Sequence, residues 1–248
     1  MNNLKFYVPQ CSGALEHAAD ALKKRGCSLT LQPDDSVTHL LLGVPSFSDD
    51  GTLKSGGDVQ TILAALPSGI TVMGGNLNHP ALEGYATVDL LRDSEYLAEN
   101  ARITAHCAVR LALERIPIII YRQPVLVVGW GRIGKCLAQL LRGMGARVTV
   151  AARKASDRAI LSALGYDVMD TNTTGYELVR FSVIFNTVPE MVFDRDALQY
   201  CDSECLKIDL ASRPGLGGDD ILWARGLPGK MTPKNSGELI AKTVLRLR

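Results

Sequence analysis

The stretch QPVLVVGWGRIGKCLAQLLRGMGARVTVAA, from Gln123 to Ala152, decides the fold of the C-terminal half of this chain. It begins with an apolar run, Pro124 to Val128, whose residues do not alternate with polar ones. Such a run is typical of a parallel strand that is covered on both faces. A glycine turn follows, then a helical pattern to about Arg142 and a second strand, Arg147 to Ala152. Because a GxGxxG turn is informative in this context, we predict a dinucleotide-binding unit of the Rossmann type.

The glycines of the turn each have a physical role in such a unit. Gly129 turns the chain sharply, Gly131 lets the backbone approach a pyrophosphate, and Gly134 lets the helix pack closely on the strand. The amino end of the helix adds free N–H groups and a partial positive charge. A glycine turn that binds nothing is the alternative. We expect cofactor contacts from Gly129, Trp130, Gly131, Arg132, Ile133 and Gly134.

The end of the second strand indicates which dinucleotide is preferred. Sites that prefer NAD usually carry Asp or Glu there, which holds the ribose 2′-hydroxyl. This chain has Ala151 and Ala152 followed by Arg153 and Lys154, with no acid before Asp157. Two cations suit a 2′-phosphate, and the planar guanidinium of Arg153 can grip it. We therefore predict NADP as the cofactor and keep NAD as the alternative, along with two solvated loop charges that bind nothing.

Composition places the chain among globular proteins and excludes several functional classes. Its 248 residues are 46% hydrophobic and 21% charged with a formal net charge of +1, so we expect no nucleic-acid partner and no membrane partner. The apolar runs are only as long as strands, and the amino terminus lacks a secretory pattern, which predicts a cytoplasmic protein. The six cysteines (11, 27, 107, 136, 201 and 205) form no CxxC motif, so we expect reduced thiols and no metal site.

The N-terminal part alternates strand and helix patterns, which predicts a smaller α/β domain with a parallel sheet. Its predicted strands are 4–8, 28–31, 39–43 and 70–73, and its predicted helices are 14–24 and 59–66. Loops that follow strands, at 43–47 and 74–79, are expected to face a substrate. We divide the chain into an N-terminal domain (1–95), a connecting helix and linker (96–122), a Rossmann domain (123–232) and a C-terminal helix (233–248).

Two later strands end in polar loops, at the edge of a parallel sheet where ligands bind. The strand 182–186 leads into an Asn-Thr-Val-Pro sequence, and the strand 206–210 leads into Ala-Ser-Arg-Pro-Gly. For the first loop we predict further cofactor contacts, from Asn186, Thr187, Val188 and Pro189.

The second loop carries the candidate catalytic residues. Arg213 precedes a rigid Pro-Gly and can bind a carboxylate through two parallel hydrogen bonds, although a surface arginine paired with an acid is an equal alternative. Asp209 is the nearest candidate for a general base, with a structural acceptor as the equal alternative. We name Asp209, Ser212 and Arg213 as candidate catalytic residues.

Six segments carry a resemblance to a known enzyme family. They are VLVVGWGRIG (Val125 to Gly134), GARVTVAAR (Gly145 to Arg153), FNTVP (Phe185 to Pro189), IDLASRPG (Ile208 to Gly215), GLPGK (Gly226 to Lys230) and TPKNSGELIA (Thr232 to Ala241). Together they resemble the A subunit of dipicolinate synthase, the enzyme that makes the pyridine-2,6-dicarboxylate of bacterial endospores. The later segments are much more specific than the dinucleotide fingerprint, and the resemblance covers the C-terminal half best.

The resemblance implies an N-terminal flavodoxin-like domain, an NADP-binding Rossmann domain and a substrate cleft between them. It implies that a dihydrodipicolinate-type precursor is oxidised to dipicolinate during sporulation, in partnership with the B subunit of the synthase. The substrate would then be a small dicarboxylate, for which Arg213 is a suitable clamp and Thr104 and Ser212 are suitable hydrogen-bond donors. We also expect a homo-oligomer.

Two other functions stay open at this point. A 2-hydroxyacid dehydrogenase would share the two-domain organisation, but that class uses an Arg–Glu–His set, and the last histidine of this chain is His106. A regulatory subunit that binds NADP without catalysis would carry the same fingerprint. Few side chains need to be catalytic in hydride transfer, so the sequence does not separate this case from an enzyme.

Overall fold

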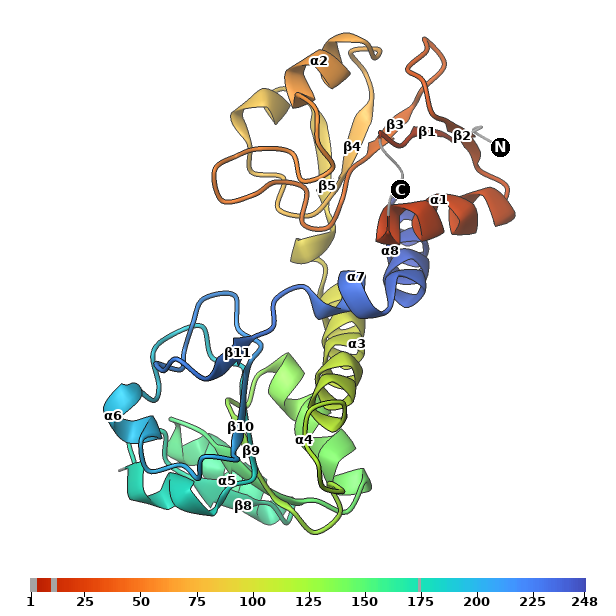
Figure 1. Ribbon diagram of the computed structural model, residues 1–248. Helices are drawn as coiled ribbons and strands as arrows, with labels where there is room; N and C mark the ends of the chain where they lie inside the picture. Colours follow the sequence, from red (N-terminus) through yellow and green to blue (C-terminus); the bar gives the residue numbers. More distant parts are fainter. Residues whose placement is uncertain (1–3, 10–12, 174) are drawn as a thin grey trace. The chain divides into compact units, whose positions relative to one another are not determined.

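The computed structural model describes residues 4–9, 13–173 and 175–248. The chain divides into two compact units, the first comprising Met1–Asn100 with Pro228–Arg248 and the second Ala101–Leu227 (Figure 1). Helix α3 (Ser94–Leu113) begins in the first unit and continues into the second without interruption. No helix among the described residues is long and apolar enough to cross a membrane.

The second unit is built on a sheet that is, in the described part of the chain, six-stranded and parallel, with the order β11-β10-β9-β6-β7-β8. Chain order runs outward from β6 in both directions, which is the arrangement of dinucleotide-binding sheets and confirms the predicted Rossmann fold. The strands are β6 (Pro124–Val128), β7 (Arg147–Ala151), β8 (Asp167–Met169), β9 (Val183–Asn186), β10 (Leu206–Asp209) and β11 (Ile221–Trp223).

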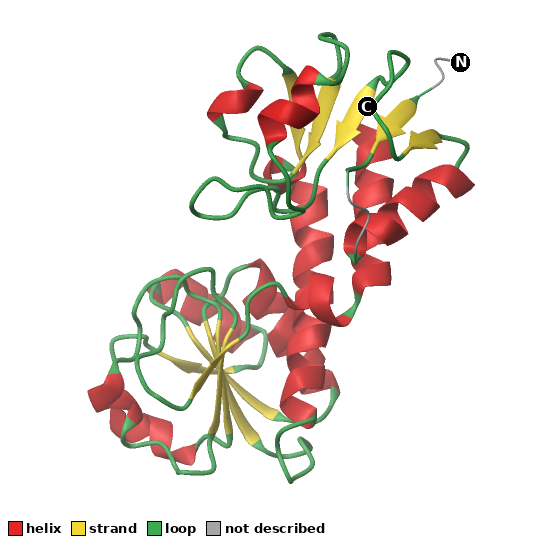
Figure 2. Ribbon diagram, turned by 45° about the horizontal axis from the view of Figure 1, so that its top comes forward, coloured by secondary structure: helices red, strands yellow, loops and turns green. Residues whose placement is uncertain are grey.

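Helices lie on both sides of this sheet, so its central strands are buried on both faces (Figure 2). Residues 125–128 of β6 are fully buried, as the unbroken apolar run predicts. On one side the core gathers Leu126, Ile184 and Phe193 with neighbouring apolar side chains. The helices of this unit besides α3 are α4 (Arg132–Gly143), α5 (Ala155–Ala163), the 3-10 helix η3 (Gly175–Arg180) and α6 (Arg195–Leu198). Helix α7 (Leu227–Met231) begins at the last residue of this unit and belongs otherwise to the first.

The first unit contains, within its described residues, a five-stranded parallel sheet in the order β2-β1-β3-β4-β5. This is the strand order of flavodoxin-like sheets, and it confirms the predicted flavodoxin-like fold. The strands are β1 (Lys5–Tyr7), β2 (Ser28–Thr30), β3 (His39–Leu41), β4 (Thr71–Gly74) and β5 (Ala86–Asp89). The connecting helices are α1 (Ala14–Lys24) and α2 (Val59–Ala64), with the 3-10 helices η1 (Pro80–Leu82) and η2 (Leu90–Arg92).

Two edge strands, β5 and β11, do not follow from the sequence pattern. Ala86 and Thr87 of β5 are exposed, and Trp223 of β11 is exposed as well. A short strand at a sheet edge buries little surface, so it shows neither a continuous apolar run nor a clear alternation. The helices and strands that are predicted agree with the structure, with ends that differ by a few residues.

The C-terminal helix α8 (Pro233–Leu247) packs on α1 within the first unit. Gly237 makes this contact close, because a Cβ atom there would lie 2.5 Å from the carbonyl oxygen of Ala14 and 2.5 Å from Cβ of His17. Arg246 and Lys242 of α8 also form ion pairs with Asp93 and Glu95 at the start of α3. Residues 233–248, predicted as a separate terminal segment, are therefore part of the N-terminal unit.

Candidate dinucleotide site

The glycine turn after β6 has the geometry that close approach requires. Gly129 has a φ of 101°, and a Cβ there would lie 2.5 Å from Oγ1 of Thr187. A Cβ at Gly134 would lie only 2.1 Å from the carbonyl oxygen of Gly129, so only glycine lets α4 approach the turn this closely. A Cβ at Gly131 would meet nothing within 4 Å, which means that this backbone faces open space. The turn is therefore tight on its inner side and open on its outer side.

Helix α4 begins directly after this turn and offers its amino end to the same open space. Its N-cap residue is Gly131, which has no side chain to satisfy the first N–H groups of the helix. The first turn of α4 carries no acidic residue. Uncapped N–H groups and the partial positive charge of a helix start suit an anionic ligand such as a phosphate.

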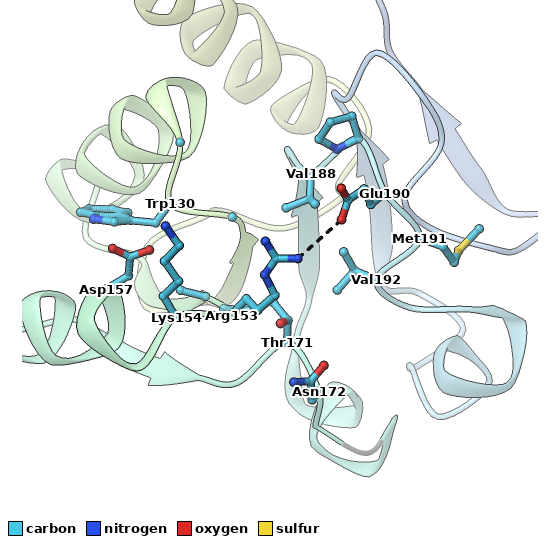
Figure 3. Close-up of a pocket in the computed structure, with 15 residues that line it drawn as sticks. Trp130, Arg153, Lys154, Asp157, Thr171, Asn172, Val188, Glu190, Met191 and Val192 are labelled. Atoms are coloured by element: carbon cyan, nitrogen blue, oxygen red, sulfur yellow. Dashed lines mark ion pairs between the residues drawn. The ribbon is translucent and has the colours of Figure 1, made fainter.

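A cavity of about 460 Å³ lies at the carboxyl ends of β6, β7, β8 and β9 (Figure 3). It spans the point at which the strand order reverses, between β6 and β9, where ligands bind in sheets of this type. Its volume is in the range of small-molecule sites. It is lined by Gly129, Trp130, Gly131, Ala151, Ala152, Arg153, Lys154, Asp157, Thr171, Asn172, Val188, Pro189, Glu190, Met191 and Val192.

The predicted cations both lie in this cavity. Arg153 and Lys154 follow β7 directly, and their side chains are exposed (Figure 3). Nη1 of Arg153 lies 3.7 Å from Oε2 of Glu190 across the cavity, with about three quarters of each side chain exposed. An ion pair that is this exposed contributes little stability, so the guanidinium is available to another anion.

The structure shows three charged residues of this region that sequence reasoning missed. Arg158 donates hydrogen bonds of 2.8 Å to the carbonyl oxygens of Ala152 and Arg153, and it pairs with Asp170. It thereby fixes the backbone that carries Arg153. Glu190 and Asp157 add negative charge to the cavity lining. Glu190 follows the predicted loop and Asp157 lies within α5. The sequence does not mark either as a site residue, since charged residues at such positions are usually only solvated.

Trp130 forms part of the cavity wall. Its ring lies edge-on to Tyr166 with centroids 5.9 Å apart, and Nζ of Lys135 lies 5.6 Å from the centroid of the ring. These two contacts hold the indole beside the glycine turn. A large flat apolar surface next to a phosphate-type site is suited to cover part of a dinucleotide.

Five residues predicted to contact a cofactor are absent from the described lining of this cavity. Asn186 is fully buried and hydrogen-bonds Asp209 and the backbone of Val188, so it shapes the loop from behind. Thr187 likewise donates to the carbonyl oxygen of Val128. From that loop, Val188 and Pro189 line the cavity, whereas Asn186 and Thr187 support it. The residues outside the lining are Arg132, Ile133, Gly134, Asn186 and Thr187.

Asp209 is a structural acceptor in this structure. Its carboxylate is fully buried and accepts hydrogen bonds from Asn186 Nδ2 and the N–H groups of Ala211, Gly215 and Leu216, at 2.7–3.1 Å. A carboxylate with both oxygens engaged in this way is not placed to take a proton from a substrate. The assignment of Asp209 as a general base is therefore replaced by a role in holding the loop 210–216.

That loop presents the other two candidate catalytic residues to solvent. Ser212 and Arg213 are both exposed, and within the described residues Arg213 forms no ion pair. The indole N–H of Trp223 donates to the carbonyl oxygen of Ala211, which steadies the loop from its other side. Thr104, by contrast, lies on α3 and is buried, with 7% of its surface exposed.

In the first unit, the two loops predicted to face a substrate lie beside each other. Ser46 is buried, donates to the carbonyl oxygen of Gly43 and accepts from the N–H of Gly75, which joins the loops. His79 caps the short helix η1 by accepting from the N–H of Ala81, and its ring stacks on Phe47. Through these contacts His79 stabilises the turn.

No protein-family model matches the chain. Among curated proteins it is similar to the A subunit of dipicolinate synthase from Bacillus subtilis (strain 168), with 26% identity over 241 residues, which cover 89% of this chain and 81% of that protein. The chain thus resembles the dipicolinate synthase A subunit along most of its length. The crystal structure of that subunit from Bacillus halodurans matches this chain with a TM-score of 0.86 and 22% identity, covering 99% of this chain and 97% of the other.

The fold extends beyond the synthase subunits. D-lactate dehydrogenase from Escherichia coli aligns with a TM-score of 0.61 and 15% identity over 98% of this chain and 96% of that one. At this identity the likeness concerns the fold alone. The synthase likeness is closer in both sequence and structure, and it confirms the family resemblance carried by the segments of the C-terminal half.

Proposed function

We propose that this chain is the A-type subunit of an NADP-dependent oxidoreductase that converts a dihydrodipicolinate-type precursor into dipicolinate. The observation that carries the proposal is the similarity to the A subunit of a dipicolinate synthase along 89% of the chain. The cavity at the strand switch point, with its glycine turn and uncapped helix, supports a dinucleotide as cofactor. A bound nicotinamide would accept a hydride from the substrate ring, and the protein would bind and orient both partners.

The cations at the end of β7 favour NADP over NAD in this proposal. Ala151 and Ala152 stand where a ribose-binding acid is usual, and Arg153 is exposed on a backbone that Arg158 holds. Glu190 argues against a preference for NADP, because its carboxylate lines the same cavity and would repel a 2′-phosphate. The pair is exposed and weak, so a dianionic phosphate would displace Glu190 from Arg153.

The substrate would be held through its carboxylates. Arg213 and Ser212 stand exposed on a loop that Asp209 fixes by hydrogen bonds to Ala211 and Gly215. A guanidinium in a fixed position can bind a carboxylate through two parallel hydrogen bonds. We also propose that the chain works with a partner of the synthase's B-subunit type and forms a homo-oligomer, as the resemblance implies.

Titration of NADP and NAD into the wild-type chain and into Arg153→Ala tests the cofactor assignment. We expect NADP to bind more tightly than NAD, and the substitution to weaken NADP binding about tenfold or more while NAD binding changes little. Arg147→Ala is the matched control, since Arg147 is exposed at the opposite end of β7. Absence of binding by either dinucleotide would overturn the enzyme assignment.

Dipicolinate formation is then measured with and without a partner protein of the B-subunit type. Turnover in either condition supports the oxidoreductase, whereas NADP binding without turnover in both conditions would indicate a regulatory role. Reduction of a 2-oxo acid in place of dipicolinate formation would indicate the dehydrogenase alternative. Against that alternative stands the absence of any histidine after His106 in the sequence.

A further inference from the structure

Cys201 and Cys205 lie close together in the second unit. They are at the amino ends of the strands, whereas the dinucleotide cavity is at the carboxyl ends. Cys201 follows α6, and its N–H donates to the carbonyl oxygen of Leu198 at 3.1 Å. Cys205 directly precedes β10, and its N–H donates to the carbonyl oxygen of Asp202 at 3.0 Å. The two consecutive turns place Cys201 next to the core cluster that holds Cys205, so that the two side chains are neighbours.

The two thiols differ in their access to solvent. Cys205 is buried, with 5% of its surface exposed, and it packs in the core beneath α6. Cys201 is half-buried and lines a second cavity, of about 340 Å³, between α6 and the segment 217–220. A small solute in this cavity can therefore contact Cys201, whereas Cys205 does not line it.

A buried cation completes the cluster. The side chain of Lys207 is 3% exposed, and its Nζ donates to the carbonyl oxygen of Cys205 at 3.2 Å and to Asp220 at 2.6 Å. Burial is the largest single effect and lowers the pKa of Lys207, but the hydrogen bond to Asp220 and the nearby negative groups together raise it. The ammonium group, paired with Asp220, is thus held against the backbone of Cys205.

The environment favours ionisation of the more accessible thiol. Interaction with the Cys205 thiol lowers the pKa of Cys201 against the effect of burial; the charge of Lys207 adds to this lowering, and the charge of Asp220 opposes it. The same interaction together with burial raises the pKa of Cys205. A thiolate in an electropositive, partly accessible position is the reactive form of cysteine, and a neighbouring thiol can resolve its first oxidation product.

We propose that Cys201 and Cys205 form a dithiol site that hydroperoxides oxidise to an intramolecular disulfide. The Cys201 thiolate attacks the peroxide oxygen, the O–O bond breaks, and a sulfenic acid forms at Cys201 with release of hydroxide. The Cys205 thiol then attacks the sulfenic sulfur, the disulfide forms, and the S–O bond breaks with release of water that carries the proton of Cys205. The hydroxide takes up the proton that Cys201 released when it ionised. The peroxide is reduced to two waters and the two thiols are oxidised, so no further reactant is needed.

This site does not depend on the proposed dinucleotide or dicarboxylate chemistry. Its residues lie at the starts of β10 and β11, whereas the dinucleotide cavity lies where β6, β7 and β9 end. Its oxidation would join the end of α6 to the start of β10. The oxidation of the two thiols can therefore be tested independently of NADP binding, and either proposal can fail without the other.

Peptide mapping of the full chain after peroxide treatment tests the proposal. The reduced protein is exposed to a small excess of hydrogen peroxide, free thiols are alkylated, and tryptic peptides are analysed by mass spectrometry. Cleavage after Arg195 and Lys207 places both cysteines in one peptide. We expect this peptide to escape alkylation and to lose the mass of two hydrogen atoms, and to regain both thiols on reduction with dithiothreitol.

Variants separate the roles of the two sulfur atoms. Cys205→Ser should leave a sulfenic acid on Cys201 that dimedone traps, and Cys201→Ser should leave Cys205 unoxidised at the same peroxide dose. Cys136→Ser is the control, because Cys136 is also half-buried and lies on α4. Oxidation of Cys201 no faster than that of Cys136 in the wild-type chain, or a peptide without the disulfide, would overturn the proposal. The wild-type measurement decides the matter even if a variant does not fold.

Discussion

Asp209 at the end of β10 and Asn186 at the end of β9 are joined by a buried hydrogen bond of 2.9 Å between their side chains. Through this pair, two neighbouring strands fix two loops at the same edge of the sheet. Asn186 orients Val188 in the cavity wall, and Asp209 holds the backbone that carries Ser212 and Arg213. The pair therefore couples the candidate cofactor loop to the candidate substrate loop.

Substitution Asp209→Ala should destabilise the second unit strongly. It leaves the N–H groups of Ala211, Gly215 and Leu216 and the amide of Asn186 without an acceptor in a buried site. Each buried donor without a partner costs about 1–3 kcal/mol, partly relieved by entering water, so we expect a loss of about 3 kcal/mol or more. Urea unfolding measures it. Asp219→Ala, which removes an exposed acid, is the control and should change stability by under about 0.5 kcal/mol.

Substitution Gly134→Ala should disrupt the glycine turn. Its Cβ would lie 2.1 Å from the carbonyl oxygen of Gly129, which is backbone and can yield only if α4 moves away from β6. We expect a destabilisation of about 1–3 kcal/mol and a loss of NADP binding of at least tenfold.

The matched control for that change is Gly143→Ala at the other end of α4. A Cβ there meets nothing within 4 Å, and alanine is the better helix former, so stability should be unchanged or rise by up to about 1 kcal/mol. Equal NADP affinity in Gly134→Ala and the wild type would show that the helix start does not form the dinucleotide site.

Substitution Arg213→Lys should weaken binding of the dicarboxylate and leave NADP binding unchanged. Lysine keeps the charge but loses the two parallel hydrogen bonds of the guanidinium, a loss of about 1.5–3 kcal/mol, or roughly 10-fold to 100-fold in affinity. Calorimetric titration with dipicolinate and with NADP measures both affinities in one protein. Arg147→Lys is the control. An equal fall in both affinities would mean that Arg213 acts on the fold and not on the substrate.

The contact between Asp93 and Arg246 should make the attachment of α8 depend on pH. The hydrogen bond from Arg246 lowers the pKa of Asp93, and the N–H of Tyr96 adds to this. Because the pKa is lower in the folded state, the stabilisation is complete above the unfolded value of about 3.9 and is lost as the pH falls through the folded value.

Arg246→Met should therefore lower the thermal midpoint more at pH 7 than at pH 3, and more at low salt than at high salt. Lys234→Met, at an exposed position of the same helix, is the control and should have little effect at either pH. A loss for Arg246→Met that is the same at both pH values would assign the effect to the packing of its aliphatic stem.

The dinucleotide-binding fold could be predicted from the sequence because its signals are local. The apolar run of β6, the turn Gly129–Gly134 and the helix α4 are consecutive, and each residue type reflects a constraint within a few positions of itself. The same is true of Arg153 and Lys154, which line the cavity because they follow the end of β7 directly. A short edge strand such as β5 carries no such signal, since it buries too little surface.

Only the tertiary structure decided which polar residues are open to a ligand and which hold the scaffold. Asp209 has the sequence position of a catalytic acid, but its donors include Asn186 on another strand, so its engagement depends on strand pairing. Glu190 meets Arg153 for the same reason, because parallel strands bring their ends to one edge. Cys201, Cys205 and Lys207 are neighbours in sequence. Their burial in the core and the ion pair of Lys207 with Asp220 depend on how the chain packs. Local sequence determines backbone geometry, whereas burial and hydrogen-bond partners are properties of the packed chain.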